Sequence, residues 1–151
     1  EGAGVLQVLK GSFPPGAASS AVLLMAQSTL HPANAFYSLL QLKCIQMKLY
    51  HVFIYTLEGM PSLEEWIPYL KKKKIRKICL MPFMLVAGNH VMYDMAGAAE
   101  ESHRVILERQ GFAVECYIHG IGENEGIQKI FQARSEENWQ KLQMDEVVQS
   151  I

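Results

Sequence analysis

Two side chains that could bind a metal ion or move a proton follow apolar segments of this sequence. His90 comes directly after the run LMPFMLVAGN, and Glu58 follows the segment VFIYTL. An imidazole and a carboxylate can both coordinate a divalent transition metal, and both can carry protons to and from a bound ligand. Asp94 lies four residues after His90. If the fold brings these segments together, they can form a metal site or an acid–base site.

Further polar groups follow two other apolar segments. Gln27 and His31 come after the first of these segments, and His119 comes after the last. A single histidine after a strand more often packs or caps a loop than binds a ligand. Glu58 could likewise stabilise the positive amino terminus of the next helix. The residues alone leave the structural and the functional interpretations open.

Four apolar segments with the length of strands alternate with four segments of helical periodicity. The predicted strands are 21–26, 52–57, 77–81 and 113–118, and the predicted helices are 33–48, 61–72, 97–110 and 124–134. Strands that alternate with helices of about 10 to 15 residues predict right-handed crossovers and a parallel sheet. The strands are apolar on both sides, so both faces of the sheet should be covered. The predicted fold class is α/β, with a four-stranded, mainly parallel sheet and helices on both faces.

Local signals mark the ends of the predicted helices. Pro61 is expected in the first turn of its helix, Ser62 with Glu65 resembles a capping box, and Gly111 is expected at a helix C-terminal cap. Residues 1–20 include the stretch GSFPPGAASS, whose Gly, Pro and Ser residues interrupt regular structure. Residues 1–20 are predicted to form a short helix and a linker, and residues 21–151 are predicted to form the α/β lobe.

The two edges of such a sheet differ. The carboxyl ends of parallel strands lie at one edge, where ligands bind in open α/β folds. Gln27, Glu58, His90 and His119 should therefore meet at this edge. The basic run KKKKIRK over 71–77 precedes the third strand and belongs to the opposite edge. It is interpreted as a solvated helix end.

The composition excludes several classes of protein. The 151 residues are 50% hydrophobic with a formal net charge of -1, which suits one domain and argues against a nucleic-acid partner. The longest apolar run is about half of the roughly 20 residues that span a bilayer, so no membrane partner is expected. Cys44, Cys79 and Cys116 are isolated in apolar runs, which favours reduced thiols and a cytoplasmic location. The sequence has no phosphate-loop, nucleophile-elbow or HExxH motif, so no organic cofactor is expected.

Four stretches together resemble the anaerobic sirohydrochlorin cobaltochelatases of cobalamin biosynthesis. They are 25–37, 53–65, 77–97 and 119–131, and the most specific feature is the succession of LMPFMLVAG, His90 and DMAG in the third stretch. Members of this family have two similar α/β lobes with the tetrapyrrole in the cleft between them. The resemblance implies that this chain corresponds to the C-terminal lobe. The implied partners are a tetrapyrrole substrate and either an N-terminal lobe or a second copy in a homo-oligomer.

The resemblance also implies an activity and the residues that perform it. These enzymes insert Co²⁺ into sirohydrochlorin, which requires the metal to lose water and two pyrrole N–H protons to leave. His90 stands at the metal-binding histidine of the family's AGDH motif, and Glu58 stands at the glutamate of its VEGYP-like motif. Both are implied to bind the metal and to act in catalysis, with Co²⁺ as a substrate.

Several motif positions depart from the family pattern. The family's MGHGT motif carries the principal catalytic histidine, whereas this sequence has Gln27 there, and an amide cannot act as a base. Asn89 replaces the aspartate of AGDH, and Tyr55 replaces a glycine. These changes imply an impaired cobaltochelatase. The alternatives are a tetrapyrrole- or metal-binding module without turnover and a lobe that serves only for packing with another chain.

Overall fold

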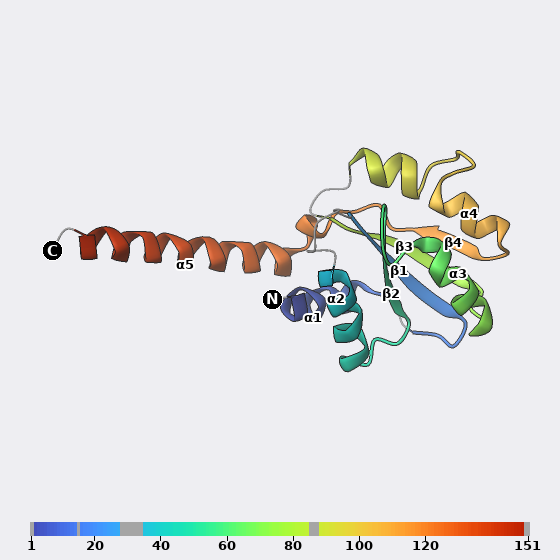
Figure 1. The fold of residues 1–151 in the computed structure, drawn as a ribbon, viewed down its shortest axis with the longest axis horizontal. Coiled ribbons are helices and arrows are strands. Elements are labelled where there is room, and N and C mark those ends of the chain that lie inside the picture. Colours follow the sequence, from blue (N-terminus) through green and yellow to red (C-terminus); the bar gives the residue numbers. More distant parts are fainter. Residues whose placement is uncertain (1, 15, 28–34, 85–87, 150–151) are drawn as a thin grey trace.

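A computed structural model describes residues 2–14, 16–27, 35–84 and 88–149 of the chain (Figure 1). Its strands are β1 (Ser20–Ala26), β2 (Val52–Thr56), β3 (Lys77–Phe83) and β4 (Ala113–Cys116). They form one sheet in the order β2-β1-β3-β4, and every neighbouring pair is parallel. The predicted α/β class and the four-stranded parallel sheet are confirmed.

Helices cover both faces of this sheet (Figure 1). The α-helices are α1 (Gly2–Leu9), α2 (Ala35–Gln46), α3 (Leu63–Lys72), α4 (His103–Arg109) and α5 (Glu125–Gln149), with short 3-10 helices at Lys10–Ser12 and Ile121–Glu123 and a π-helical turn, η3 (His90–Met95). Buried residues of α3, η3 and α4 pack on one face, whereas α1, α2 and the first turn of α5 pack on the other. The sheet is therefore the middle layer of three.

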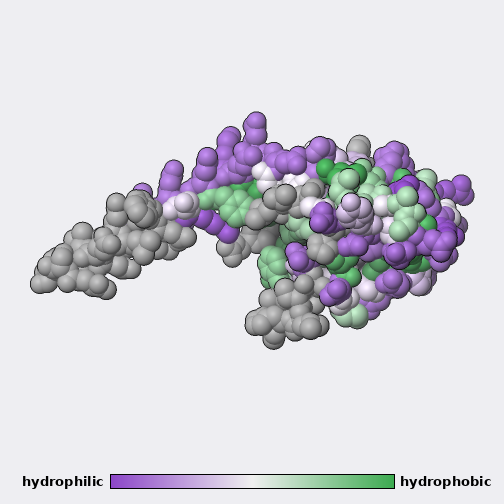
Figure 2. Space-filling model, turned by 90° about the horizontal axis from the view of Figure 1, so that it is seen from above, coloured by the Kyte–Doolittle hydropathy of each residue, from purple (hydrophilic) through white to green (hydrophobic). Residues whose placement is uncertain are grey.

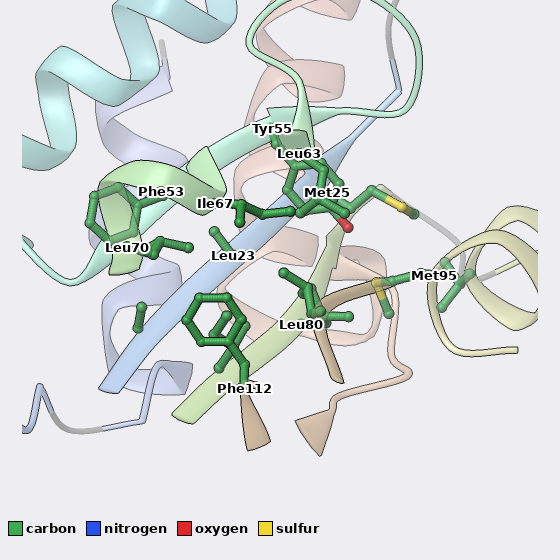
Figure 3. Close-up of a cluster of buried hydrophobic side chains, with 14 residues drawn as sticks. Leu23, Met25, Phe53, Tyr55, Leu63, Ile67, Leu70, Leu80, Met95 and Phe112 are labelled. Atoms are coloured by element: carbon green, nitrogen blue, oxygen red, sulfur yellow. The ribbon is translucent and has the colours of Figure 1, made fainter. Parts of the chain in front are cut away.

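The two cores follow from the alternation of side chains along β1. Leu23 and Met25 point to the face covered by α3 and α4, and Val22 and Leu24 point to the opposite face. Figure 3 shows the first of these clusters, in which Leu23 and Met25 lie beside side chains from β2, β3 and α3. A central strand that is buried on both sides must be apolar at consecutive positions, as the sequence of β1 is.

The helix-end signals are confirmed at two places and wrong at one. Ser62 Oγ accepts from the Glu65 amide at 3.3 Å, and Glu65 Oε2 accepts from the Ser62 amide at 2.7 Å, which completes the capping box. Gly111, with φ of 96°, follows the C-cap of α4 in the left-handed region that favours glycine. Pro61, however, precedes the N-cap Ser62, so it lies outside α3 rather than in its first turn.

Two of the predicted helices differ from their predicted bounds by more than two residues. Helix α4 begins at His103 rather than at residue 97, because Ser102 caps it by accepting from the Val105 amide. Helix α5 continues to Gln149, beyond the predicted end at residue 134, through a segment without Gly or Pro. In Figure 1 its distal part extends away from the lobe.

The outer surface of the lobe is more polar than its interior layers (Figure 2), as the burial of the apolar side chains between the layers predicts. Hydrophilic side chains cover much of the lobe in the view of Figure 2, with apolar areas between them. Over the described parts of the chain, no helix combines the length and the hydropathy needed to cross a lipid bilayer.

We expect Ser62→Ala to lower the free energy of unfolding by about 1 kcal/mol, because it removes the side-chain acceptor of the capping box. Urea denaturation measures this difference. Ser38→Ala is the control, since Ser38 is exposed within α2 and alanine has the higher helix propensity. An equal loss of stability in the two variants would contradict the role of the cap.

Candidate functional site

The carboxyl ends of β1, β2 and β3 lie level with one another. Ala26, the last residue of β1, pairs with Thr56 of β2 and with Phe83 of β3. The segments that carry Gln27, Glu58 and His90 therefore leave the sheet at the same edge. The prediction that these segments leave the sheet together depends only on the backbone, and the strand pairing agrees with it.

The described side chains at this edge face solvent. Gln27 and Glu58 are both exposed, and Glu58 has an interaction partner in the structure. The carbonyl of Gln27 accepts from the hydroxyl of Tyr37 in α2, and the Leu57 amide donates to the carbonyl of Ala26 at 3.0 Å. The loops after β1 and β2 are thus held by hydrogen bonds, while the Gln27 and Glu58 side chains remain accessible.

Part of the predicted site lies outside the described residues. This applies to His31 and to the side chain of His90, of which the structure describes the backbone as the first residue of η3. The convergence of the His90 and Glu58 side chains therefore stays a prediction. Among the side chains that are described, no group of three or more His, Cys, Asp or Glu residues is placed to hold a metal ion.

Two buried side chains anchor the turn that begins at His90. Val91 and Met95 have no exposed surface and pack in the core between the sheet and α4. The Ala96 amide donates to the Val91 carbonyl at 3.0 Å, the five-residue spacing of a π-helix. Short π-helical turns occur frequently at functional sites. Here the turn brings Val91 and Met95 to the same buried side and fixes the backbone at His90.

The end of the DMAG sequence is fixed by helix α4. A Cβ on Gly97 would lie 2.5 Å from the Tyr93 carbonyl oxygen, so this position requires glycine. The Gly97 carbonyl accepts from Ser102 Oγ at 2.8 Å and from the Arg104 guanidinium at 3.1 Å. Ser102 is fully buried and also caps α4. Met95 and Gly97 are therefore explained by packing, and this packing positions the turn that carries His90.

A buried tyrosine–histidine pair lies beside this turn, and the sequence analysis did not predict it. Tyr55 in β2 is fully buried, and its hydroxyl lies 2.8 Å from Nδ1 of His103 with the rings edge to face. Burial raises the pKa of Tyr55 well above its ordinary value. Burial also lowers the pKa of His103, opposed by the charges of Asp94 and Glu64. A neutral His103 therefore accepts the hydrogen bond that a buried tyrosine hydroxyl needs.

His119 follows β4 as predicted, but its surroundings favour the structural interpretation. Its Nδ1 lies 2.8 Å from Glu123 Oε2, its ring packs on Tyr117, and both side chains of the polar contact are more than half exposed. Exposed contacts of this kind contribute little to stability. The pair borders a cavity of about 350 Å³ on the face that α1 covers, away from η3.

Comparisons with known proteins agree with the fold and with the sequence motifs. Residues 3–139 match the sequence model of the family described as Cobalt chelatase (CbiK). The chain is 33% identical over 111 residues to the sirohydrochlorin cobaltochelatase CbiKC of Nitratidesulfovibrio vulgaris, which covers 74% of this chain and 39% of that protein. It is 27% identical over 129 residues to the sirohydrochlorin cobaltochelatase of Salmonella typhimurium, which covers 85% of this chain and 48% of that protein.

A solved structure shares the fold at lower identity. It is described as a cobalamin (vitamin B12) biosynthesis CbiX protein of Marinobacter aquaeolei VT8, with a TM-score of 0.57 and 18% identity over 81% of this chain and 98% of that one. The four-stranded parallel sheet and the edge that carries these motifs define a chelatase-like lobe. The chain belongs to the cobalt chelatase (CbiK) family. It spans less than half the length of each of the two curated relatives.

The buried pair predicts how stability depends on pH. The pKa of His103 is lowered from 6.5 in the folded state, so the unfolded chain binds more protons and stability falls as the pH falls below about 6.5. His103→Asn keeps an acceptor for the Tyr55 hydroxyl but removes the titrating ring. We expect the free energy of unfolding to decline less between pH 7.5 and 5.5 in this variant than in the wild type.

Urea denaturation at each pH measures the two slopes, and titrating groups that do not interact with His103 cancel in their difference. Parallel pH dependences for wild type and His103→Asn would contradict the assignment of a neutral His103.

Proposed function

We propose that this chain is a lobe of a sirohydrochlorin cobaltochelatase and takes part in inserting Co²⁺ into sirohydrochlorin. One observation carries the proposal. The chain is a member of this family, and the loops that bear Gln27, Glu58 and His90 leave its parallel sheet at the same edge. Both curated relatives are sirohydrochlorin cobaltochelatases. The three cysteines are free, which suits a reaction in the reducing cytoplasm.

We assign His90 and Glu58 to the incoming metal and to the departing pyrrole protons. Co²⁺ is the substrate metal, and no organic cofactor is needed because no bond of the macrocycle is oxidised or reduced. An imidazole nitrogen and a carboxylate oxygen can replace water on a borderline cation, and each can accept a proton once the metal has passed to the macrocycle. The anchoring of η3 by Val91 and Met95 supports this assignment, since a positioned ligand loses less freedom on binding.

Gln27 is the residue of the proposed site that is least suited to catalysis. It occupies the motif position of the family's principal catalytic histidine, yet its amide neither accepts a proton nor coordinates cobalt as well as an imidazole does. Its exposed side chain is open to a bound ligand. This residue favours the second candidate function, a lobe that binds a tetrapyrrole or a metal without turnover. Measured insertion would separate the two functions.

A second lobe would complete the tetrapyrrole cleft, supplied either by an N-terminal lobe or by a second copy of this chain. Four large apolar side chains of α2 support this proposal, because they are 41 to 50% exposed although their helix also packs on the sheet; they are Phe36, Leu39, Leu42 and Ile45. A helix with large apolar side chains on its outer face as well as on its inner face is typical of an element covered on both faces.

We expect His90→Ala to weaken Co²⁺ binding by on the order of tenfold or more, because even an outer-shell partner of a metal contributes that much. Binding by the wild type should weaken from pH 8 to pH 6, since an imidazole must be neutral to coordinate. Isothermal titration calorimetry measures both effects. The control is His51→Gln, which changes a histidine at the opposite edge. Equal affinities in wild type and His90→Ala would remove His90 from the site.

We expect Gln27→His to raise cobalt insertion by about 10²-fold, the contribution of a positioned general base. The absorbance change of sirohydrochlorin, corrected for the uncatalysed reaction, measures the rate. Gln46→His, an exposed change in the last turn of α2, is the matched control. The assay is run with this chain alone and with an added N-terminal lobe of a relative. No gain in either setting, with the tetrapyrrole bound, would show that Gln27 is not the deficient position.

A further inference from the structure

Half of the cationic side chains gather at the amino edge of the sheet, opposite the edge proposed for metal insertion. Seven of the fourteen Lys and Arg residues are Lys48 and the cations of 71–77, although the whole chain has a net charge of -1. These residues end α2 and α3 and begin β3. The distribution gives this edge a positive potential that the net charge does not reveal.

A cleft opens among these cations. Its volume is about 510 Å³, and Lys48, Tyr50, His51, Phe53 and Lys73 contribute to its lining together with the loop before β1. Clefts that bind small molecules typically have volumes of about 300 to 1,000 Å³. Among the described residues that line it, there is no Asp or Glu. The cleft is therefore of a size for a small ligand, and its charge is of one sign.

The two lysines of the cleft have no carboxylate partners among the described residues. The Lys73 ammonium lies over the rings of Tyr69 and Phe53, 5.0 and 6.0 Å from their centroids. Neighbouring cations are engaged differently, since Lys71 donates to Gln110 and Lys77 pairs with Glu115. Lys48 and Lys73 are thus available to an anion in the cleft.

The backbone at Lys48 has a left-handed conformation that glycine adopts without strain. Helices α2, α3 and α4 end with the same hydrogen-bond pattern, closed by the amides of Leu49, Ile75 and Phe112. The left-handed residue of this pattern is Gly111 after α4 but a lysine, Lys48 or Lys74, after the other two. A non-glycine residue in this conformation is strained, because its Cβ lies too close to the following carbonyl oxygen.

The helix macrodipole opposes this strain. A cation near a helix C-terminus is stabilised by the macrodipole, and this stabilisation is available to a lysine anywhere in the last turn. Glycine would satisfy the same backbone pattern without strain, as Gly111 does. Lys74 has the same conformation without lining the cleft, so the backbone alone does not identify a ligand site, but it makes Lys48→Gly a substitution that the fold should tolerate.

We propose that this cleft binds a small anion with two or more negative charges, through Lys48 and Lys73. Two ammonium groups match a ligand that carries either linked phosphates or several carboxylates, since both form charge-assisted hydrogen bonds with lysine. Lys74 and Arg76 strengthen the potential around the cleft without lining it. The site is separate from the metal-insertion edge, so it stands or falls independently of the proposed chelatase activity.

Calorimetric titration of the full chain with pyrophosphate and, separately, with citrate tests this proposal at constant ionic strength set by sodium chloride. We expect saturable binding of at least one of them. Preference for pyrophosphate would assign a phosphate-bearing ligand, and preference for citrate a polycarboxylate. Lys48→Gly should weaken that binding by about tenfold, the effect of removing one charge-assisted contact. Lys73→Gln, which changes the second lysine without a change in backbone preference, should have a similar effect.

Thermal unfolding provides a second readout. Glycine suits the left-handed backbone at this position, so Lys48→Gly should unfold at the same temperature as the wild type or higher. Weaker anion binding without loss of stability is the result expected of a binding residue. Lys129→Gln, which removes an exposed positive charge from α5, should bind the anion as the wild type does. Absence of binding by both anions, or equal affinities in wild type and both cleft variants, would overturn the proposal.

Discussion

The parallel pairing of β1 with both of its neighbours is the constraint on which the rest of the structure depends. Because β1 lies between β2 and β3 and runs in the same direction as both, the residues after all three strands reach one edge. The residues before them reach the other edge. The sheet thus separates groups that can accept protons, such as Glu58, from the lysines that follow α2 and α3.

Burial of apolar side chains at the carboxyl edge provides the rigidity that exposed polar groups cannot provide for themselves. Val91 and Met95 are buried under the π-helical turn, and Ser102 and Arg104 hold the carbonyl of Gly97 where the turn ends. A residue at the start of this turn can be exposed and still have a fixed backbone. Met95 and Gly97 of the DMAG sequence therefore contribute to the candidate site through packing.

The Tyr55–His103 pair shows what a polar group requires in this core. A buried tyrosine hydroxyl without a hydrogen bond would cost about 1–3 kcal/mol by protein mutational data and several kcal/mol relative to transfer into hydrocarbon. The imidazole of His103 provides this hydrogen bond at 2.8 Å. Burial in turn keeps the imidazole neutral, since its pKa is lowered. The two side chains depend on each other, and they join β2 to the amino terminus of α4, next to η3.

The sequence by itself determined the four strand–helix units, the capping box of Ser62 with Glu65 and the left-handed Gly111. Periodicity and helix caps depend on residues a few positions apart, so a local pattern is sufficient to predict them. Only the tertiary structure decided that residues 90–95 form a π-helical turn and that Tyr55 bonds to His103, 48 residues away. These features result from packing between distant segments, which no local pattern encodes.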